Sequence, residues 1–230
     1  MDLADQATGI AALAEPVRRE LYEYVVAQQD AVGREQAATG VGVAVHIAKF
    51  HLDRLVQDGL LDVEFRRLTG RTGPGAGRPS KLYRRSDTQW SVSLPDRRYD
   101  LVGHILASGV ERAAAEGLDI DAALDDSALT EGRRVGGAAE ASDEPGDDST
   151  RLAGTLAEQG YEPRVEEDEV ILANCPFDAL AREHTQLVCR LNLSFVRGVV
   201  DGLGCDGVEA RLEPEPGLCC VRARRRDRPR

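Results

Sequence analysis

The sequence is poor in aromatic residues and has no long apolar run. Phe, Trp and Tyr make up only 4% of the 230 residues, although 42% are hydrophobic. The folded cores of this one- or two-domain chain must therefore be built mainly from Ala, Leu and Val. No apolar stretch approaches the roughly 20 residues needed to span a bilayer, and Met1–Asp5 lacks the basic-then-apolar pattern of a signal peptide. We expect a cytoplasmic protein without a membrane partner.

Recognisable catalytic patterns are also missing. The glycines between Gly70 and Gly77 do not have the spacing of a P-loop or of a dinucleotide-binding turn. The sequence contains no paired carboxylates, no nucleophile elbow and no Cys-x-x-Cys pair. A redox enzyme that used a cysteine nucleophile would have only His184 as a basic partner. We therefore expect that the protein is not an enzyme.

Acidic residues are absent from one segment of an otherwise acidic chain. The net charge is -11, yet residues 65–85 contain seven basic residues and no acidic one. These basic residues surround a Gly/Pro-rich stretch that has almost no apolar side chain to bury. A local basic segment on an acidic protein is typical of a surface that binds a polyanion, and double-stranded DNA is the simplest candidate.

The periodicity around this segment predicts a winged helix-turn-helix. Apolar spacings of three and four, with Pro16 suited to a first turn and Gly59 to a helix end, favour helices rather than strands. Helices are expected over residues 9–30, 34–39 and 43–58. Alternation of apolar and polar residues predicts a strand before the basic loop, and a short strand is expected after it. These strands are expected over residues 60–67 and 81–84.

The second helix of such a motif enters the major groove of DNA. Here it is the helix over 43–58, on which His46 and Lys49 share a face. Its apolar side is expected to include Val43, Ile47, Phe50 or His51, Leu55 and Val56. The wing would contact phosphates or an adjacent minor groove. The expected DNA contacts are His46, Lys49, Arg54, Arg66, Arg67, Arg71, Arg78, Lys81 and Arg84. The alternative is a protein-binding or structural winged helix whose basic loop is merely solvated.

Three stretches of this region resemble ArsR-type winged-helix transcriptional regulators of bacteria. They are Leu13-Ala-Glu-Pro-Val-Arg-Arg-Glu-Leu-Tyr22, Phe50-His-Leu-Asp-Arg-Leu-Val-Gln-Asp-Gly-Leu-Leu61 and Gly77-Arg-Pro-Ser-Lys-Leu-Tyr-Arg84. The resemblance covers about residues 8–90. It implies a homodimer that reads a palindromic operator, with the helix expected over 96–117 as a candidate dimer element.

The rest of the chain completes an α+β fold: an N-terminal winged helix-turn-helix domain plus a small C-terminal α+β domain with an antiparallel sheet. Acidic residues and glycines predict a flexible linker before the last domain. The last domain is expected to combine helices over 150–159 and 177–203 with strands over 162–166, 169–174, 208–212 and 218–223. The expected parts are a DNA-binding domain (8–90), a helical dimerisation or connecting segment (96–131), the acidic linker (132–148), a cysteine-containing sensor domain (149–225) and a basic tail (226–230).

Every cysteine lies in that last domain. The five are Cys175, Cys189, Cys205, Cys219 and Cys220. In a reducing compartment, clustered cysteines more often bind metal or react with oxidants than form disulfides. A zinc ribbon would need Cys-x-x-Cys pairs, but separated thiolates can still meet around an iron–sulfur cluster, zinc or Cu(I). Cys219 and Cys220 are consecutive on an expected strand, so their side chains should point to opposite faces and one of them should be the ligand.

These cysteines lie in stretches similar to the C-terminal half of SufR-type iron–sulfur-responsive repressors. The matching pieces are Cys175-Pro-Phe177, Ala181-Arg-Glu-His184, Leu187-Val-Cys-Arg-Leu-Asn192 and Cys219-Cys220. The resemblance covers about residues 150–225. It implies a 4Fe–4S or 2Fe–2S cluster held by Cys175, Cys189 and either Cys219 or Cys220. Cys205 and His184 are weaker candidates for a further ligand.

Together these patterns predict a homodimeric, DNA-binding transcriptional repressor that senses iron–sulfur or redox status. Cluster occupancy would fix the helix that carries Cys189 against the strand that carries Cys219 and Cys220, and so bias the DNA-reading heads. Four alternatives stay open. The C-terminal domain could hold a structural zinc or a small-molecule ligand, its thiols could sense oxidants directly, or its cysteines could be small buried core residues.

Overall fold

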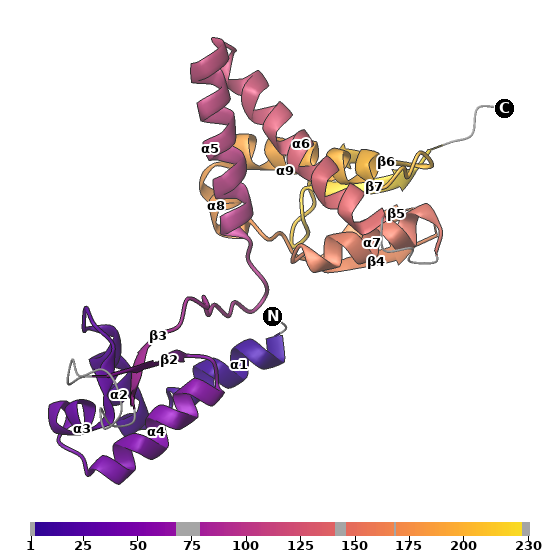
Figure 1. Cartoon of the computed structure of the whole chain (residues 1–230). Coiled ribbons are helices and arrows are strands. Elements are labelled where there is room, and N and C mark those ends of the chain that lie inside the picture. The colour runs from indigo at the N-terminus through magenta and orange to yellow at the C-terminus, as the bar shows by residue number, and fades with distance from the viewer. Residues whose placement is uncertain (1–2, 68–78, 141–145, 168, 227–230) are drawn as a thin grey trace. The chain divides into compact units, whose positions relative to one another are not determined.

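The protein folds as two compact units in a computed structural model, which describes residues 3–67, 79–140, 146–167 and 169–226 (Figure 1). The N-terminal unit is Met1–Val92 and the C-terminal unit is Ser93–Arg230. Each unit combines helices with an antiparallel sheet, which confirms the predicted α+β class. Within the described ranges, no helix is both long and apolar enough to cross a bilayer.

The N-terminal unit packs its helices against a small sheet. Its elements are α1 (Leu3–Ala12), α2 (Pro16–Val26), β1 (Val32–Gly33), α3 (Arg34–Val41), α4 (Val45–Gln57), β2 (Leu61–Arg66) and β3 (Ser80–Arg85). Pro16 opens α2, and the Glu15 carboxylate caps it by accepting hydrogen bonds from the Val17 and Arg18 backbone N–H groups. The strand order is β1-β3-β2, and β3 pairs antiparallel with both neighbours.

The buried face of α4 agrees with the prediction at Leu55 and at His51, the alternative to Phe50, but differs from it at other positions. Ala48, Leu52 and Leu55 are fully buried, whereas Ile47 is exposed and the Phe50 side chain is 64% exposed. Apolar residues occupy most positions of this helix, so two stripes with spacings of three and four were available in the sequence. Tertiary packing against α2 and α3 selects the stripe with the smaller residue, Ala48, and leaves Phe50 on the surface.

The C-terminal unit has a single core shared by helices and sheet. Its elements are α5 (Tyr99–Glu116), α6 (Ile120–Glu140), α7 (Asp148–Glu158), β4 (Pro163–Glu166), β5 (Glu169–Leu172), α8 (Asp178–Glu183), α9 (Thr185–Gly202), β6 (Val208–Leu212) and β7 (Val221–Arg225). The sheet is antiparallel with the order β4-β5-β7-β6. Leu101 of α5 and Leu124 of α6 belong to the same core as Phe195 and Val221. The expected division between a connecting segment (96–131) and a sensor domain (149–225) is therefore wrong.

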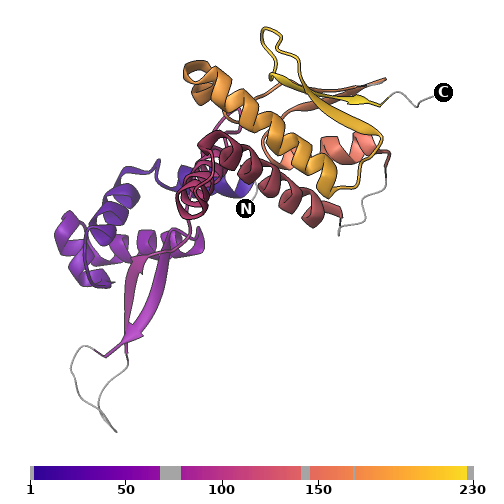
Figure 2. The ribbon, with the colours of Figure 1, turned by 90° about the horizontal axis from the view of Figure 1, so that it is seen from above.

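The flexible linker predicted over 132–148 is also wrong for residues 132–140, because α6 continues to Glu140. Residues 141–145 lie outside the described ranges, and Asp147 caps α7 by accepting a hydrogen bond from the Thr150 backbone N–H. Two glycines of this stretch, Gly132 and Gly136, serve close helix packing rather than flexibility. Figure 2 shows α6 and α9 side by side.

Four glycines let the backbones of α6 and α9 approach each other. A Cβ added at Gly132 would lie 2.1 Å from the Phe195 carbonyl oxygen, and one at Gly198 would lie 2.2 Å from the Leu129 carbonyl oxygen. Gly136 and Gly202 repeat the pattern one turn along, at 2.4 Å from the nearest carbonyl oxygen in each case. Only glycine permits this backbone approach, so these four positions set the distance between α6 and α9.

The adjacent glycines Gly136 and Gly137 provide a matched test. Gly136→Ala places a methyl group against the α9 backbone and should destabilise the C-terminal unit by about 1–3 kcal/mol. Gly137→Ala meets nothing closer than 4.0 Å and lies on the exposed side of α6. It should stabilise the helix by about 0.5–1 kcal/mol. Calorimetric unfolding of the full chain measures both effects, and equal stability of the two variants would contradict this packing.

Candidate functional site

Four of the five cysteines form one thiol cluster, defined here as Cys175, Cys189, Cys219 and Cys220. Cys175 interacts electrostatically with Cys219, Cys219 with Cys220, and Cys220 with Cys189. Cys175 lies between β5 and α8, Cys189 lies on α9, and the last two precede β7. The structure therefore brings together the predicted ligands Cys175 and Cys189 with both members of the late pair.

Cys219 and Cys220 lie before β7, which corrects the expectation that both belong to the last strand. The strand begins at Val221, although the Cys219 backbone N–H still donates to the Leu172 carbonyl at 2.9 Å. Because the chain is not part of the pleated ladder here, the two side chains do not diverge as expected. The Asn192 Nδ2 atom lies 3.1 Å from Cys219 Sγ and 4.0 Å from Cys220 Sγ.

The surroundings of three of these thiols, Cys175, Cys189 and Cys219, favour the protonated form. The interaction with Cys219, together with burial, raises the pKa of Cys175 far above its ordinary value. The interaction with Cys175 lowers the pKa of Cys219, but the interaction with Cys220 and burial outweigh it and raise the pKa to about 11. Burial also raises the pKa of Cys189. Direct oxidant sensors rely on exposed thiols of low pKa, and the raised pKa values of Cys175, Cys189 and Cys219 differ from that pattern.

The weaker ligand candidates have other surroundings. Cys205 is fully buried after α9, and its Sγ lies 3.6 Å from the Asp148 carbonyl oxygen. His184 is exposed at the junction of α8 and α9, where its backbone N–H donates to the Leu180 carbonyl. In the described part of the chain, no group of three or more His, Cys, Asp or Glu side chains is arranged to hold a metal ion as it stands. A metal would have to displace the thiol protons and draw the sulfurs together.

Two buried polar residues adjoin the thiol cluster. The Tyr161 hydroxyl donates a hydrogen bond to Asn192 Oδ1, and Asn192 Nδ2 donates to Cys219 Sγ. Tyr161 also packs edge-on against Phe177, with the ring centroids 6.3 Å apart. Asn192 lies near Cys189 on α9, one helical turn further along, whereas Tyr161 was not singled out from the sequence. No local pattern links Tyr161 to a residue 31 positions away.

The loop that carries Cys175 holds the first residues of the C-terminal unit, residues 93–98, called here the connector. Arg97 Nη1 donates to Asn174 Oδ1 at 2.6 Å and to the Cys175 carbonyl at 3.4 Å. Asn174 Nδ2 donates back to the Asp96 carbonyl at 3.1 Å, and the Arg98 backbone N–H donates to the Pro176 carbonyl at 3.1 Å. The connector is thus bonded to the residues on both sides of Cys175, a contact that sequence reasoning missed.

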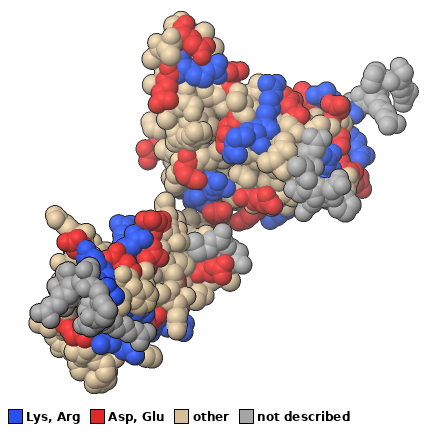
Figure 3. All heavy atoms as spheres, viewed as in Figure 1, with Lys and Arg blue, Asp and Glu red and all other residues tan. Residues whose placement is uncertain are grey.

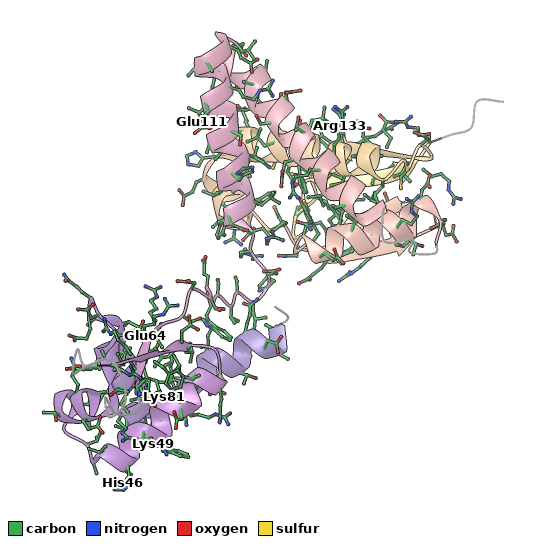
Figure 4. The ribbon with its side chains drawn as sticks, in the orientation of Figure 1. His46, Lys49, Glu64, Lys81, Glu111 and Arg133 are labelled. Atoms are coloured by element: carbon green, nitrogen blue, oxygen red, sulfur yellow. The ribbon has the colours of Figure 1, made fainter. Side chains whose placement is uncertain are left out.

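The N-terminal unit holds a second candidate site, the exposed face of α4. His46 and Lys49 lie one turn apart on it, both exposed (Figure 4). No ion-pair partner is found for either of them, or for the exposed Arg67, among the residues that the structure describes. Phe50 and Val45 are exposed on the same helix, at 64% and 42%. This face therefore combines cationic and apolar groups.

Other predicted DNA contacts already have acidic partners. Arg54 pairs with Asp58 at 2.9 Å, Arg66 with Glu64 at 3.4 Å, Arg84 with Asp62 at 3.2 Å, and Lys81 with Asp53. On the side seen in Figure 3, basic and acidic side chains of this unit lie next to one another. Arg71 and Arg78 lie outside the described residues. The positive charge of the segment 65–85 is therefore partly neutralised by acidic residues elsewhere in the unit.

Comparison with known proteins adds no assignment: no family model, no curated protein and no solved structure matches the chain.

The Asp53 carboxylate joins α4 to β3 and yields a pH-dependent prediction. Burial raises the pKa of Asp53, but hydrogen bonds from Lys81 and Tyr83 outweigh burial and hold the pKa below its ordinary 3.8. The contribution of a group with a lowered pKa is fully present above the unfolded-state pKa and is lost as the pH falls through the folded-state value. Asp53→Asn should cost about 0.5–1 kcal/mol near neutral pH, because the pair is partly solvent-exposed.

Urea titrations of wild type and Asp53→Asn at neutral pH and at a series of acidic pH values measure this contribution. The difference between the two proteins should shrink as the pH falls towards the folded-state pKa of Asp53. A difference that is absent at neutral pH, or that is unchanged on acidification, would contradict the role given to Asp53.

Proposed function

We propose that this protein is a homodimeric DNA-binding transcriptional regulator, with a winged helix-turn-helix in its N-terminal unit and a cysteine-ligated iron–sulfur site in its C-terminal unit. The observation that carries the proposal is the convergence of four thiols in one unit, next to the connector that follows the other unit. The order α2, α3, α4, β2, β3 and the sheet order β1-β3-β2 support the N-terminal assignment.

In this proposal, α4 enters the major groove. His46 and Lys49 supply donors to base edges or phosphates, and the exposed Phe50 and Val45 suit apolar contact with thymine methyl groups. Because Arg54, Arg66, Lys81 and Arg84 are already paired, each would have to exchange a carboxylate for a phosphate. We therefore expect binding with a smaller salt dependence than a count of basic residues implies.

The thiol cluster fits an iron–sulfur centre by the chemistry of its donors. Iron–sulfur clusters are most often held by four cysteine thiolates, and Cys175, Cys189, Cys219 and Cys220 are four neighbouring thiols from three parts of the chain. When bound, a cluster would supply a redox-active centre that replaces thiol protons. Zinc could use the same donors, so metal analysis of the purified protein must decide between the two.

The coupling between the two sites runs through the connector. Ligation would require the Cys175 sulfur to lose its proton and its present interaction with Cys219. The Asn174–Pro176 backbone around that sulfur also binds the connector through Arg97 and Arg98. The ligation state of Cys175 would therefore bias the connector, and with it the placement of the DNA-reading unit.

The homodimer in this proposal uses the tip of the α5–α6 hairpin. Val110, Leu118 and Ile120 are exposed apolar residues there, at 54%, 42% and 45%. A second copy of the chain would remove these side chains from water.

Metal content and colour test the C-terminal half of the proposal. Wild-type protein purified without oxygen should be brown, with iron and sulfide in equal amounts and a visible thiolate-to-iron absorption. Cys175→Ser should lose most of this absorption, whereas Cys205→Ser, which removes a buried thiol outside the thiol cluster, should keep it. A colourless wild-type protein with one zinc would favour the structural-zinc alternative, and a protein free of bound metal would reject the site.

Salt dependence tests the N-terminal half. Wild type should bind a pool of random-sequence DNA duplexes at low ionic strength, with log K falling linearly against log salt. Lys49→Ala should reduce that slope by about 0.9, the loss of one phosphate contact. Arg84→Ala is the matched control and should change the slope less, because its guanidinium is paired with Asp62. Failure of folded wild type to bind duplex at low salt would overturn the DNA-reading role.

A further inference from the structure

Asn192 is an unusual residue for its place in the C-terminal unit. It lies on α9 among buried apolar residues, and its side chain is 1% exposed. A buried amide costs free energy unless its donors and acceptor are satisfied. Its acceptor, Oδ1, receives a hydrogen bond from the Tyr161 hydroxyl. Among the described residues, the partners of Nδ2 are the sulfurs of Cys219 at 3.1 Å and Cys220 at 4.0 Å.

The Tyr161 hydroxyl sets which end of the amide faces the sulfurs. Tyr161 is 2% exposed, and its hydroxyl donates a hydrogen bond to the Asn192 side chain. A donor requires an acceptor, which assigns Oδ1 to the Tyr161 side and Nδ2 to the sulfur side. The edge-on contact of the Tyr161 ring with Phe177 further limits its movement.

The benefit of this orientation depends on the protonation state of the sulfurs. A thiol sulfur is a weak hydrogen-bond acceptor, and a hydrogen bond to a charged acceptor is roughly twice as strong as a neutral one. With protonated thiols, the Asn192 donor therefore gains little over an apolar residue of similar size. With thiolates, the same N–H group gains a charged partner in a buried site, where electrostatic interactions are stronger than in water.

We propose that Asn192 is a positioning residue that donates an N–H···S hydrogen bond to the Cys219 and Cys220 thiolates of a bound cluster, with Tyr161 fixing its orientation. This inference rests on the proposed iron–sulfur function and extends it by naming residues that tune the site. Reduction adds negative charge to a cluster and its thiolates, so a donor aimed at the sulfurs favours the reduced state and raises the reduction potential.

A redox titration of reconstituted protein tests the role of Asn192. Asn192→Leu removes the donor but keeps an apolar volume suited to the core, and should lower the midpoint potential. The expected shift corresponds to roughly a tenfold change in the ratio of reduced to oxidised cluster, about 59 mV for a one-electron couple. Tyr161→Phe keeps the donor but frees its orientation, so its potential should fall by less.

Two controls separate tuning from a merely structural role. Ser127→Ala removes another buried polar side chain of the C-terminal unit, and should leave the potential at the wild-type value. Unfolding of the metal-free variants measures stability alone, and there Asn192→Leu should be less stable than wild type because the buried Tyr161 hydroxyl loses its acceptor. If Asn192→Leu does not fold, the smaller shift of Tyr161→Phe remains the test.

The possible failures are distinguishable. Wild type that binds no iron would overturn the proposed function and this inference with it. Wild type that binds a cluster, with wild-type potentials for Asn192→Leu and Tyr161→Phe, would overturn this inference alone. A stability loss in metal-free Asn192→Leu with no change of potential would make Asn192 a structural residue.

Discussion

The close approach of α6 and α9 determines the rest of the C-terminal unit. Gly132 and Gly136 on one helix and Gly198 and Gly202 on the other bring the two backbones together. This contact fixes the position of α9, which carries both Cys189 and Asn192. The sheet then packs against α9 through β6 and β7, and the residues just before β7 carry Cys219 and Cys220 towards the same point. Thiols that come from distant parts of the chain stay together only if the elements that carry them are held rigidly, as α9 is here.

In the C-terminal unit, hydrogen bonds link the residues around Cys175 to the connector, the segment with which the unit begins. The connector forms hydrogen bonds to Asn174, Cys175 and Pro176 rather than to a surface far from the sulfurs. The Asn174 amide is itself 7% exposed and donates to the Gly160 carbonyl, so it is held from two sides. A movement of the backbone at Cys175 should therefore also move the connector, to which that backbone is hydrogen-bonded.

Local patterns in the sequence predicted most elements but few of their tertiary partners. Strand alternation in β2, the proline at the start of α2 and the glycine after α4 are signals that lie within a few residues of the structure they specify. Lys81 and Asp53 are 28 positions apart and Tyr161 and Asn192 are 31 apart. Nothing in the local sequence indicates such pairs, so the Lys81–Asp53 ion pair and the Tyr161–Asn192 contact could not be predicted.

The glycines of α6 led to the largest error, the flexible linker that was predicted where α6 continues to Glu140. Gly136 and Gly137 lie in an acidic, Gly/Ala-rich stretch that is typical of a linker, and their composition alone cannot separate flexibility from close helix packing. The set of Cys175, Cys189 and a late cysteine was predicted from a resemblance. The grouping of both Cys219 and Cys220 with them was not predicted, because the exact start of β7 decides where those side chains point.

In the mechanism we propose, ligation at Cys175 changes DNA binding through the connector. The most direct measurement is the affinity of one anaerobic preparation for a duplex selected by that protein, before and after metal removal, in wild type and in Arg97→Ala. We predict that metal removal changes the affinity of wild type at least several-fold and that Arg97→Ala, while still binding both metal and duplex, loses most of that difference. An equal response in both proteins, or no response in wild type, would contradict the account.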